Sequence, residues 1–378
     1  MVKYIFSFAI IISFFSFKTG QDENPFWNNG EPVFEVQQLF EGERFPNVVV
    51  ATNGNVVTSW GRKDFRVSFS EDGGKTWCKP KTLHDPGFHG GGMVVNDNNG
   101  DILVFMGEKH PEMIPKQTMK EPVKAYKSED NGKTWNEYQF KILPDLLGNV
   151  PDLHMSERGI TLKHGEKAGR LIRPARVYYG NIGAHQAGYN TAIYSDDNGK
   201  TWHPSSPFPA LGTGEGAIEE LSNGVLYYNS RRHWAPKGEN PRRRWEAWSY
   251  DQGETWADLK IIEKLPDGAQ HRDYGLMGGL VRLPIEEHDI LIFSNIESEK
   301  GRHHGTVWAS FDGGKTWPVK RLVDEGDFAY SSLAAGKEGT PAEGMIYLLY
   351  EAGPVGKIAR FNLAWVTNGR DWREFLDK

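Results

Sequence analysis

Several arginine and carboxylate side chains stand next to strand-like runs in this sequence. Arg44 opens the run ending at Val50, whose valines are typical of a buried strand. Glu215 precedes another such run, and Arg231 follows at the distance of a β-hairpin. Because a guanidinium matches a carboxylate through two parallel hydrogen bonds, both arginines are candidates for holding an acidic ligand.

Three more residues have types that suit chemistry on such a ligand. Arg302 stands just before a further strand-like run, and Tyr330 lies in the segment DFAYSSLAAG. A tyrosine near its usual pKa of about 10 is a poor nucleophile and needs a neighbouring base. Asp64 is the only carboxylate between Arg44 and Glu71, which makes it a candidate proton donor.

A repeated motif marks the elements that must position these residues. Ser-x-Asp-x-Gly-x-Thr-Trp occurs five times, at Ser70–Trp77, Ser128–Trp135, Ser195–Trp202, Ser249–Trp256 and Ser310–Trp317. Copies about 60 residues apart indicate one supersecondary unit used repeatedly. Asp-x-Gly is turn chemistry, each copy follows a strand-like run, and the Trp is an apolar anchor that would lock the turn to its own sheet.

These units predict an all-β fold, a six-bladed β-propeller of four-stranded antiparallel blades. Five blades follow from the five motifs. The two chain ends are expected to close the sixth, with residues 32–40 pairing with residues 345–353 and 358–367. The segment Val366–Trp372, VTNGRDW, looks like a degenerate sixth copy of the motif.

The motif resembles the Asp-box of the sialidase (neuraminidase) superfamily, in which it lies on the outer turn of each blade, away from the catalytic face. Other segments carry the resemblance further. Arg44-Phe45-Pro46 resembles the family's Arg-Ile-Pro, and the segments holding Glu215 with Arg231, Arg302, and Tyr330 resemble family segments in the same order. The resemblance runs from Arg44 to Glu351.

The resemblance implies an exo-acting, retaining glycoside hydrolase that removes terminal sialic acid, or a related 2-keto-3-deoxy sugar acid, through a tyrosyl intermediate without cofactor or metal. It implies these roles: Tyr330 as nucleophile, Glu215 as its base, Asp64 as acid/base, Arg44, Arg231 and Arg302 as carboxylate ligands, Glu351 as the partner of Arg44, and Arg62 as a pocket residue. Arg232 competes with Arg231 for its role.

The sequence departs from the family pattern in three places. The loop that carries Asp64 is shorter than the family's, so either Asp64 is the acid/base or the chemistry is altered. A glycine triplet in Gly87–Val95 allows a close backbone approach, and Glu157-Arg158 replaces part of a family turn. Because the family contacts its sugar at these places, the identity of the acidic sugar stays open.

Two other functions fit some of the residues. A polysaccharide lyase acting on uronates would neutralise a carboxylate with arginine and remove a proton with His89, His185 or Tyr330. A non-catalytic glycan-binding propeller is the third possibility. The pairing of Tyr330 with Glu215 argues against it, because a lectin has no need of an activated tyrosine.

The whole chain sets further bounds. Residues 1–22 contain a run of about 13 mostly apolar residues, Ile5–Phe17, which predicts a signal peptide and a secreted or periplasmic protein; a buried first strand is the alternative. Residues 23–378 are expected to form one catalytic domain, a monomer with a glycan partner. The single Cys78 permits no internal disulfide, and a net charge of −6 without a long basic run disfavours nucleic acid.

Overall fold

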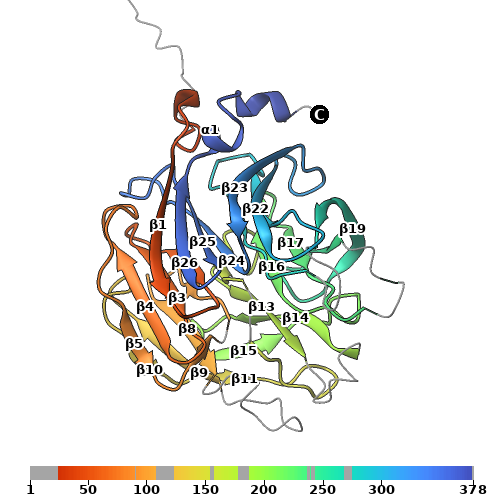
Figure 1. Ribbon diagram of the computed structural model, residues 1–378. Coiled ribbons are helices and arrows are strands. Elements are labelled where there is room, and N and C mark those ends of the chain that lie inside the picture. The colour runs from red at the N-terminus through yellow and green to blue at the C-terminus, as the bar shows by residue number, and fades with distance from the viewer. Residues whose placement is uncertain are drawn as a thin grey trace, which may run out of the picture.

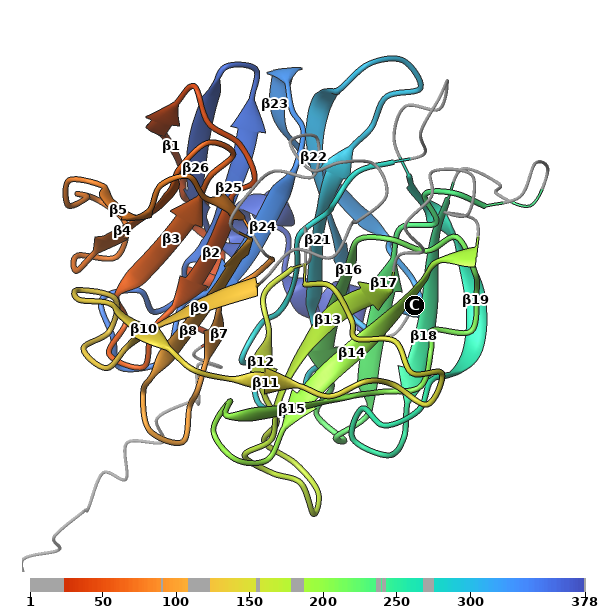
Figure 2. The same ribbon diagram turned by 90° about the horizontal axis from the view of Figure 1, so that it is seen from below.

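The computed structural model describes residues 24–89, 91–107, 123–153, 157–177, 187–235, 239, 243–267 and 275–376. The predicted signal peptide lies outside these residues. Six β-sheets follow one another in chain order around the molecule (Figures 1 and 2). The innermost strands of successive sheets contact each other, and the last contacts the first, so the ring is closed. The predicted six-bladed propeller is confirmed.

In the first three blades the strands follow one another from the axis outward. Blade one contains β2 (Asn47–Val50), β3 (Val56–Trp60), β4 (Phe65–Ser70) and β5 (Lys81–His84). Blade two contains β7 (Val94–Val95) and β6 (Phe88–His89), both paired with β8 (Ile102–Gly107), then β9 (Val123–Ser128) and β10 (Asn136–Tyr138). Blade three contains β12 (Ile160–Thr161), β13 (Leu171–Val177), β14 (Tyr189–Ser195) and β15 (Thr201–Pro204), and β11 (Lys141–Ile142) adds in parallel to β15.

The remaining blades have four antiparallel strands each. Blade four contains β16 (Gly216–Glu220), β17 (Leu226–Ser230), β18 (Arg243–Ser249) and β19 (Ala257–Pro266). Blade five contains β20 (Leu280–Arg282), β21 (Leu291–Ile296), β22 (His303–Ser310) and β23 (Val319–Asp327). Blade six contains β24 (Ser331–Ala335), β25 (Ile346–Ala352), β26 (Val355–Phe361) and β1 (Phe34–Glu41).

Blade six joins the two ends of the described chain. Strand β1 pairs antiparallel with β26, and Phe34 lies opposite Phe361 in the register (Figure 1). The two ends thus close blade six as predicted, with β25 paired to β26 and β26 to β1, although residues 362–367 lie beyond the sheet. The interpretation of Val366–Trp372 as a sixth turn motif is wrong. The chain beyond β26 forms the short helix α1 (Leu363–Val366) and the 3-10 helix η4 (Trp372–Phe375), because Asn362 accepts a hydrogen bond from the Trp365 N–H and starts a helical turn.

The five turn motifs share one hydrogen-bond pattern, which Asp72 illustrates. Its Oδ1 accepts from the Ser70 hydroxyl at 2.8 Å and the Thr76 N–H at 2.9 Å, and its Oδ2 accepts from the Thr76 hydroxyl at 2.6 Å. The hydrogen bond from the Thr76 hydroxyl is the main cause that lowers the pKa of the half-buried Asp72 carboxyl. The aspartates thus act as turn staples.

The motifs also anchor neighbouring blades to each other. Two motif tryptophans pack on their own sheet as expected, Trp256 on Tyr228 and Trp317 on Phe293. Trp202 is fully buried and meets Phe105 of blade two edge-on at 5.7 Å. Gly199 of blade three has a φ of +86°, and a Cβ there would lie 2.4 Å from Leu103 of blade two. The corresponding glycines of the other copies also face the second strand of the preceding blade: Gly74 on Tyr347, Gly132 on Val57, Gly253 on Ile172 and Gly314 on Tyr227.

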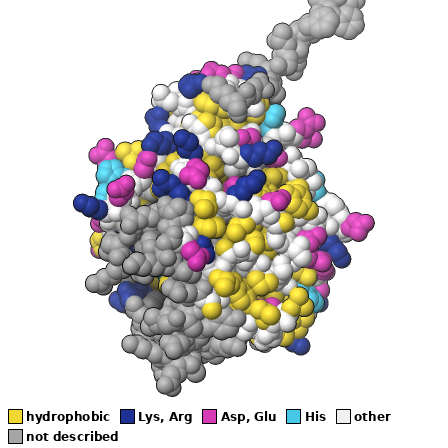
Figure 3. All heavy atoms as spheres, turned by 90° about the vertical axis from the view of Figure 1, so that its right-hand side faces the viewer, with side chains coloured by type: hydrophobic (Ala, Val, Ile, Leu, Met, Phe, Trp, Pro, Cys, Tyr) yellow, Lys and Arg dark blue, Asp and Glu magenta, His cyan; other side chains and the backbone are white. Residues whose placement is uncertain are grey.

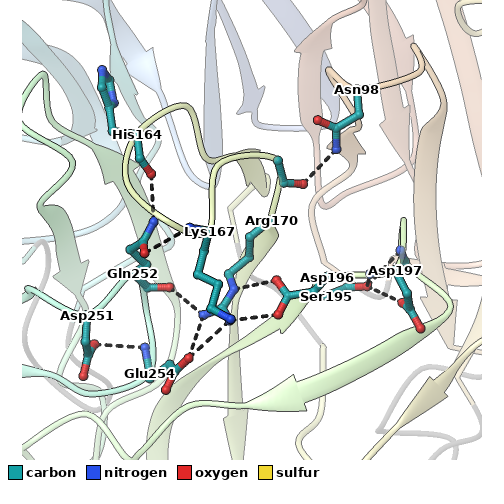
Figure 4. Close-up of polar contacts among 12 residues, drawn as sticks. Asn98, His164, Lys167, Arg170, Ser195, Asp196, Asp197, Asp251, Gln252 and Glu254 are labelled. Atoms are coloured by element: carbon teal, nitrogen blue, oxygen red, sulfur yellow. Dashed lines mark hydrogen bonds and ion pairs between the residues drawn. The ribbon is translucent and has the colours of Figure 1, made fainter.

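A buried arginine joins two of these motifs on the same face (Figure 4). Arg170 donates to both oxygens of Asp196 at 2.8 and 2.9 Å, and to Glu254 at 3.2 Å. It also donates to the Gln252 carbonyl at 3.0 Å. Because Asp196 and Glu254 lie in the motifs of blades three and four, this guanidinium ties the two blades together.

The surface is mixed in character. On the side drawn in Figure 3, acidic and basic side chains are interspersed, and hydrophobic side chains lie among them. Within the described residues, no helix is both long and apolar enough to cross a membrane.

Candidate active site

Glu215 and Arg231 are neighbours across the β16–β17 hairpin. The Arg231 N–H donates to the Glu215 carbonyl at 2.9 Å, one pair beyond Gly216 and Ser230 in the register. The Arg231 guanidinium also donates to Glu215 Oε2, and both side chains are buried. A turn at Asn223-Gly224 sets this register, so local sequence brings the carboxylate and the arginine together.

Tyr330 and Glu351 form the equivalent pair at the end of the β24–β25 hairpin. The Glu351 N–H donates to the Tyr330 carbonyl at 3.0 Å. The Glu351 carboxylate then accepts two hydrogen bonds from Arg44, from Nε at 3.1 Å and from Nη2 at 2.9 Å. Glu351 also accepts from the Phe45 N–H at 2.9 Å, so it fixes both the start of blade one and the direction of Arg44.

Tyr330 lies where blades four, five, six and one converge. Its hydroxyl donates to Glu215 Oε1 at 3.1 Å. The guanidinium carbons of Arg44 and Arg302 lie 5.4 and 5.3 Å from the centre of its ring. Arg302 lies just before β22, and its carbonyl accepts from the Phe328 N–H at 2.9 Å, two residues before Tyr330. The structure thus brings Arg44, Arg231, Arg302, Glu215 and Tyr330 into one cluster.

The electrostatics of this cluster favour an ionised Glu215 and a protonated Tyr330. Burial alone would raise the pKa of Glu215, but the charges of Arg231, His233 and Arg176 outweigh it and lower the pKa to about 2. Burial raises the pKa of Tyr330, and the Glu215 charge raises it further against the opposing effect of the arginines. The hydroxyl therefore keeps its proton at rest and offers it to Glu215.

Asp64 lies beside this cluster but faces a different partner. Its Oδ2 accepts two hydrogen bonds from Arg66, at 2.9 and 2.7 Å. Its position is tied to Arg44 through Gly61, whose N–H donates to the Arg44 carbonyl at 2.8 Å. Glu43 holds the same loop by accepting from the Arg62 N–H at 2.7 Å. The short loop thus keeps Asp64 next to the strand that Arg44 opens, with its charge balanced by Arg66.

Residues that the sequence did not single out complete the surroundings of Glu215. Arg176 ends the run RLIRPAR on β13 and is fully buried, and His233 follows Arg231 by two positions. The only sequence signal was the density of arginines in these two runs. Arg232 points elsewhere: it donates to the Leu211 carbonyl at 3.0 Å and to Glu239 at 2.9 Å, so Arg231 is the arginine that contacts Glu215.

The two histidines of the lyase alternative have side chains outside the described part of the structure. His185 lies outside the described residues, and only the backbone of His89 is described, in β6. Part of the glycine triplet is explained by packing, because a Cβ on Gly92 would lie 2.3 Å from the Arg158 nitrogen. Among the described residues, no group of three or more His, Cys, Asp or Glu side chains is arranged to hold a metal ion.

A cavity of about 570 Å³ opens at the opposite end of the inner strands. Its lining includes Val50 of β2, Ile160 of β12, Glu219 of β16 and Ala335 of β24. None of the residues expected to do chemistry lies in it. The cavity is the far mouth of the propeller axis.

Comparisons with known proteins agree with this architecture. The family described as BNR repeat-like domain matches residues 90–347, more than half of the chain. The chain belongs to this family. Among curated proteins, this BNR repeat chain is similar to a sialidase from Micromonospora viridifaciens, with 29% identity over 89% of the chain and 55% of the relative. A sialidase from Bacteroides fragilis is 29% identical over 76% of the chain and 54% of that protein.

These matches confirm that the BNR repeat chain belongs to the sialidase superfamily, although it spans about half the length of the two curated relatives. Among solved structures, the Hadza microbial sialidase Hz136 aligns with a TM-score of 0.66 and 23% identity, over 86% of this chain and 66% of that one. The intramolecular trans-sialidase from Ruminococcus gnavus has the same TM-score at 16% identity, over 86% and 95%. At these identities the solved structures support the fold.

Proposed function

We propose that this chain is an exo-acting, retaining glycosidase of the sialidase type, which removes a terminal sialic acid or a related 2-keto-3-deoxy sugar acid from a glycan. One observation carries the proposal: the Tyr330 hydroxyl donates to Glu215 within a cluster of three arginines. A non-catalytic carbohydrate site has no use for a buried tyrosine paired with a carboxylate. The similarity to sialidases at 29% identity points the same way.

In this proposal, Arg44, Arg231 and Arg302 bind the carboxylate on the anomeric carbon. The phenol oxygen of Tyr330 attacks that carbon as its proton passes to Glu215, and the bond to the leaving oxygen breaks. A neutral phenol approaches a carbon bearing a carboxylate with less repulsion than a carboxylate nucleophile would. Two successive displacements retain the configuration, since water then attacks the same carbon from the vacated side.

Substrate binding itself would activate the base. In the free protein the charge of Arg231 helps to hold the pKa of Glu215 at about 2, so Glu215 is a weak base. A substrate carboxylate on the three arginines would offset that positive charge. The pKa of Glu215 would then rise, and proton transfer from Tyr330 would become easier when the substrate is in place.

Asp64 is the proposed acid/base. It would protonate the leaving oxygen and later take a proton from the attacking water. Since Arg66 holds the Asp64 carboxylate through two hydrogen bonds, this role requires the pair to separate or rearrange when substrate binds. Arg62, on the same loop, is the proposed pocket residue.

We also propose that the protein is exported and acts on glycans as a monomer. The apolar run Ile5–Phe17 supports export. Sequencing the N-terminus of protein recovered from a host with a secretion pathway tests this. A mature start near residue 23 is expected, whereas an intact Met1 would contradict it.

The activity is tested with purified protein and a fluorogenic ketoside of N-acetylneuraminic acid. We expect release of the fluorophore, reduced about 10³-fold or more in Tyr330→Phe. The matched control is Tyr347→Phe, which removes a buried hydroxyl bonded to the Gly73 carbonyl on the far face and should leave the rate unchanged.

Parallel reactions separate the alternatives. Ketosides of other 2-keto-3-deoxy acids show which sugar is preferred. A uronate polysaccharide followed for unsaturated product in the ultraviolet tests the lyase. Unsaturated product alone, or glycan binding without any turnover, would overturn the proposal.

A further inference from the structure

Glu157 is a buried carboxyl group on the propeller axis that the proposed mechanism does not use. Its Oε1 accepts from the Ser332 hydroxyl at 2.6 Å and lies 3.5 Å from Asn47 Nδ2. Asn47 Nδ2 donates to the Ser332 oxygen at 2.9 Å, which also accepts from the Val48 N–H at 3.1 Å. Glu157, Asn47 and Ser332 therefore form one hydrogen-bonded cluster, the axial cluster.

Each residue that Glu157 contacts lies within three positions in the chain of a residue of the candidate site. Asn47 follows Arg44 by three positions, and Ser332 follows Tyr330 by two. The Glu157 N–H donates to the carbonyl of Gly216, the residue after Glu215, at 3.0 Å. We propose that Glu157 is a positioning residue, whose side chain holds the strands that follow Arg44 and Tyr330 in register at the axis, while its backbone N–H ties the same segment to the strand after Glu215; this rests on the function proposed above.

The backbone around Glu157 is fixed on every side that the structure describes. Arg158 donates to the Leu333 carbonyl at 3.0 Å and forms an ion pair with Glu219 on β16. Blade two closes on the same segment through Gly92, where a Cβ would meet the Arg158 nitrogen at 2.3 Å. The Met93 N–H donates to Asn47 Oδ1 at 2.8 Å. Four inner strands, β2, β7, β16 and β24, thus meet at this segment.

The carboxyl group works in its neutral form. Burial raises the pKa of Glu157 to about 8, against the hydrogen bond from Ser332 and the charge of Arg158, and the charge of Glu219 adds to the increase. Burial also raises the pKa of Glu219 to about 7, although Arg158 opposes it. A neutral Glu157 has nearly the shape and charge of glutamine, which makes Glu157→Gln the conservative variant.

The test compares Glu157→Gln with Glu157→Ala. A misplacement of about 1 Å costs roughly 10²-fold in rate, so Glu157→Ala should lose kcat by about 10- to 100-fold, whereas Glu157→Gln should stay within about threefold of the unchanged protein. The matched control is Glu246→Ala. It removes another buried carboxyl, which accepts from the Tyr227 hydroxyl at 2.8 Å, and should lower stability without lowering kcat.

The pH dependence gives a readout that simple packing would not change. Because the native pKa of about 8 lies above the ordinary 4.5, Glu157 stabilises the fold fully below pH 4.5, and this contribution is lost as the pH rises to about 8. The melting temperature of the unchanged protein should therefore fall more steeply over this window than that of Glu157→Gln. Parallel curves would overturn the inference.

A spectroscopic test works even if no sialoside is cleaved. The ultraviolet titration of each variant is compared with that of the same variant carrying Tyr330→Phe, which isolates the Tyr330 signal. Glu157→Gln should match the unchanged protein, and Glu157→Ala should titrate at lower pH because Tyr330 becomes more accessible to water. Without sialoside cleavage the proposed function fails. Three results would overturn the role of Glu157. The Tyr330 titration could be equal in all variants, Glu157→Ala could keep a full kcat, or Glu157→Gln could be as slow as Glu157→Ala.

Discussion

At the scale of the residue, the site depends on how neighbouring charges set protonation. Glu215 is fully buried, yet Arg231, His233 and Arg176 lower its pKa to about 2. A base this weak would rarely accept a proton from Tyr330, whose own pKa is raised. The pair becomes productive only when something offsets the positive charge around it, and a ligand carboxylate has the required charge.

The first prediction concerns this coupling. Glu215 must be ionised to accept the proton, so its native pKa sets an acidic limb below which activity is lost. The pH profile of kcat/KM reports the free enzyme, so its acidic limb due to Glu215 should lie near pH 2. The profile of kcat reports the enzyme–substrate complex, so its acidic limb should lie at higher pH. Complete pH profiles of both parameters check this, and superimposable acidic limbs would contradict it. Glu215→Gln should lower kcat by about 10²- to 10⁴-fold.

The second prediction concerns the direction of Arg44. Replacing Glu351 by Gln removes the charge from a pair held by two hydrogen bonds, so Arg44 should lose its fixed orientation. We expect KM to rise about 10-fold with a smaller change in kcat, because charge-assisted hydrogen bonds contribute about 1.5–3 kcal/mol. Steady-state kinetics measure both. The control Glu35→Gln weakens an exposed pair with Arg360 and should leave KM unchanged; a fall in kcat alone for Glu351→Gln would count against the role.

At the scale of the element, antiparallel hairpins place pairs of site residues opposite each other, and the turn motifs hold neighbouring blades together. The register of β16–β17 sets Glu215 opposite Arg231, and that of β24–β25 sets Tyr330 opposite Glu351. At the other ends of the blades, each motif glycine faces the preceding blade. The site residues and the turn motifs therefore lie at opposite ends of the strands, on opposite faces of the propeller.

The third prediction follows from the position of the motif tryptophans. Trp202 is fully buried between blades two and three, so Trp202→Ala should lower the free energy of unfolding by about 3–5 kcal/mol. Trp77 is only partly buried, and Trp77→Ala should cost less. Denaturant unfolding measures the free energies. Both variants should keep their kcat under native conditions, and equal losses of stability would contradict the expected role of burial.

At the scale of the whole molecule, the propeller is a ring closed by joining its first and last strands. Strand β1 covers the edge of β26, which would otherwise expose unpaired backbone groups. Phe34 of β1 stacks on Trp365 of α1 with ring centres 4.3 Å apart, and its ring lies 6.5 Å from that of Phe361. The site needs this closure, since Arg44 of blade one and Glu351 of blade six meet across it.

The fourth prediction tests the closure. Phe34→Ala removes the stacked ring and should cost about 3 kcal/mol, which for a chain of this size is a fall in melting temperature of roughly 4 °C. Val36→Ala, which truncates an exposed side chain of the same strand, is the control and should change the melting temperature little. Thermal unfolding followed by circular dichroism measures both. If the two variants melt together, the strand does not hold the ring closed.

Local sequence patterns were enough to locate the blades, because turn chemistry and strand alternation act over a few residues. Five motif copies located five blades, and the hairpin spacing from Glu215 to Arg231 was enough to expect one pair of the site. Contacts between blades could not be predicted in this way. The fold placed Trp202 between blades two and three, brought Arg176 to Glu215, and buried Glu157 at the axis. These contacts join segments that are remote in the chain, and ring closure, which no local pattern encodes, sets them.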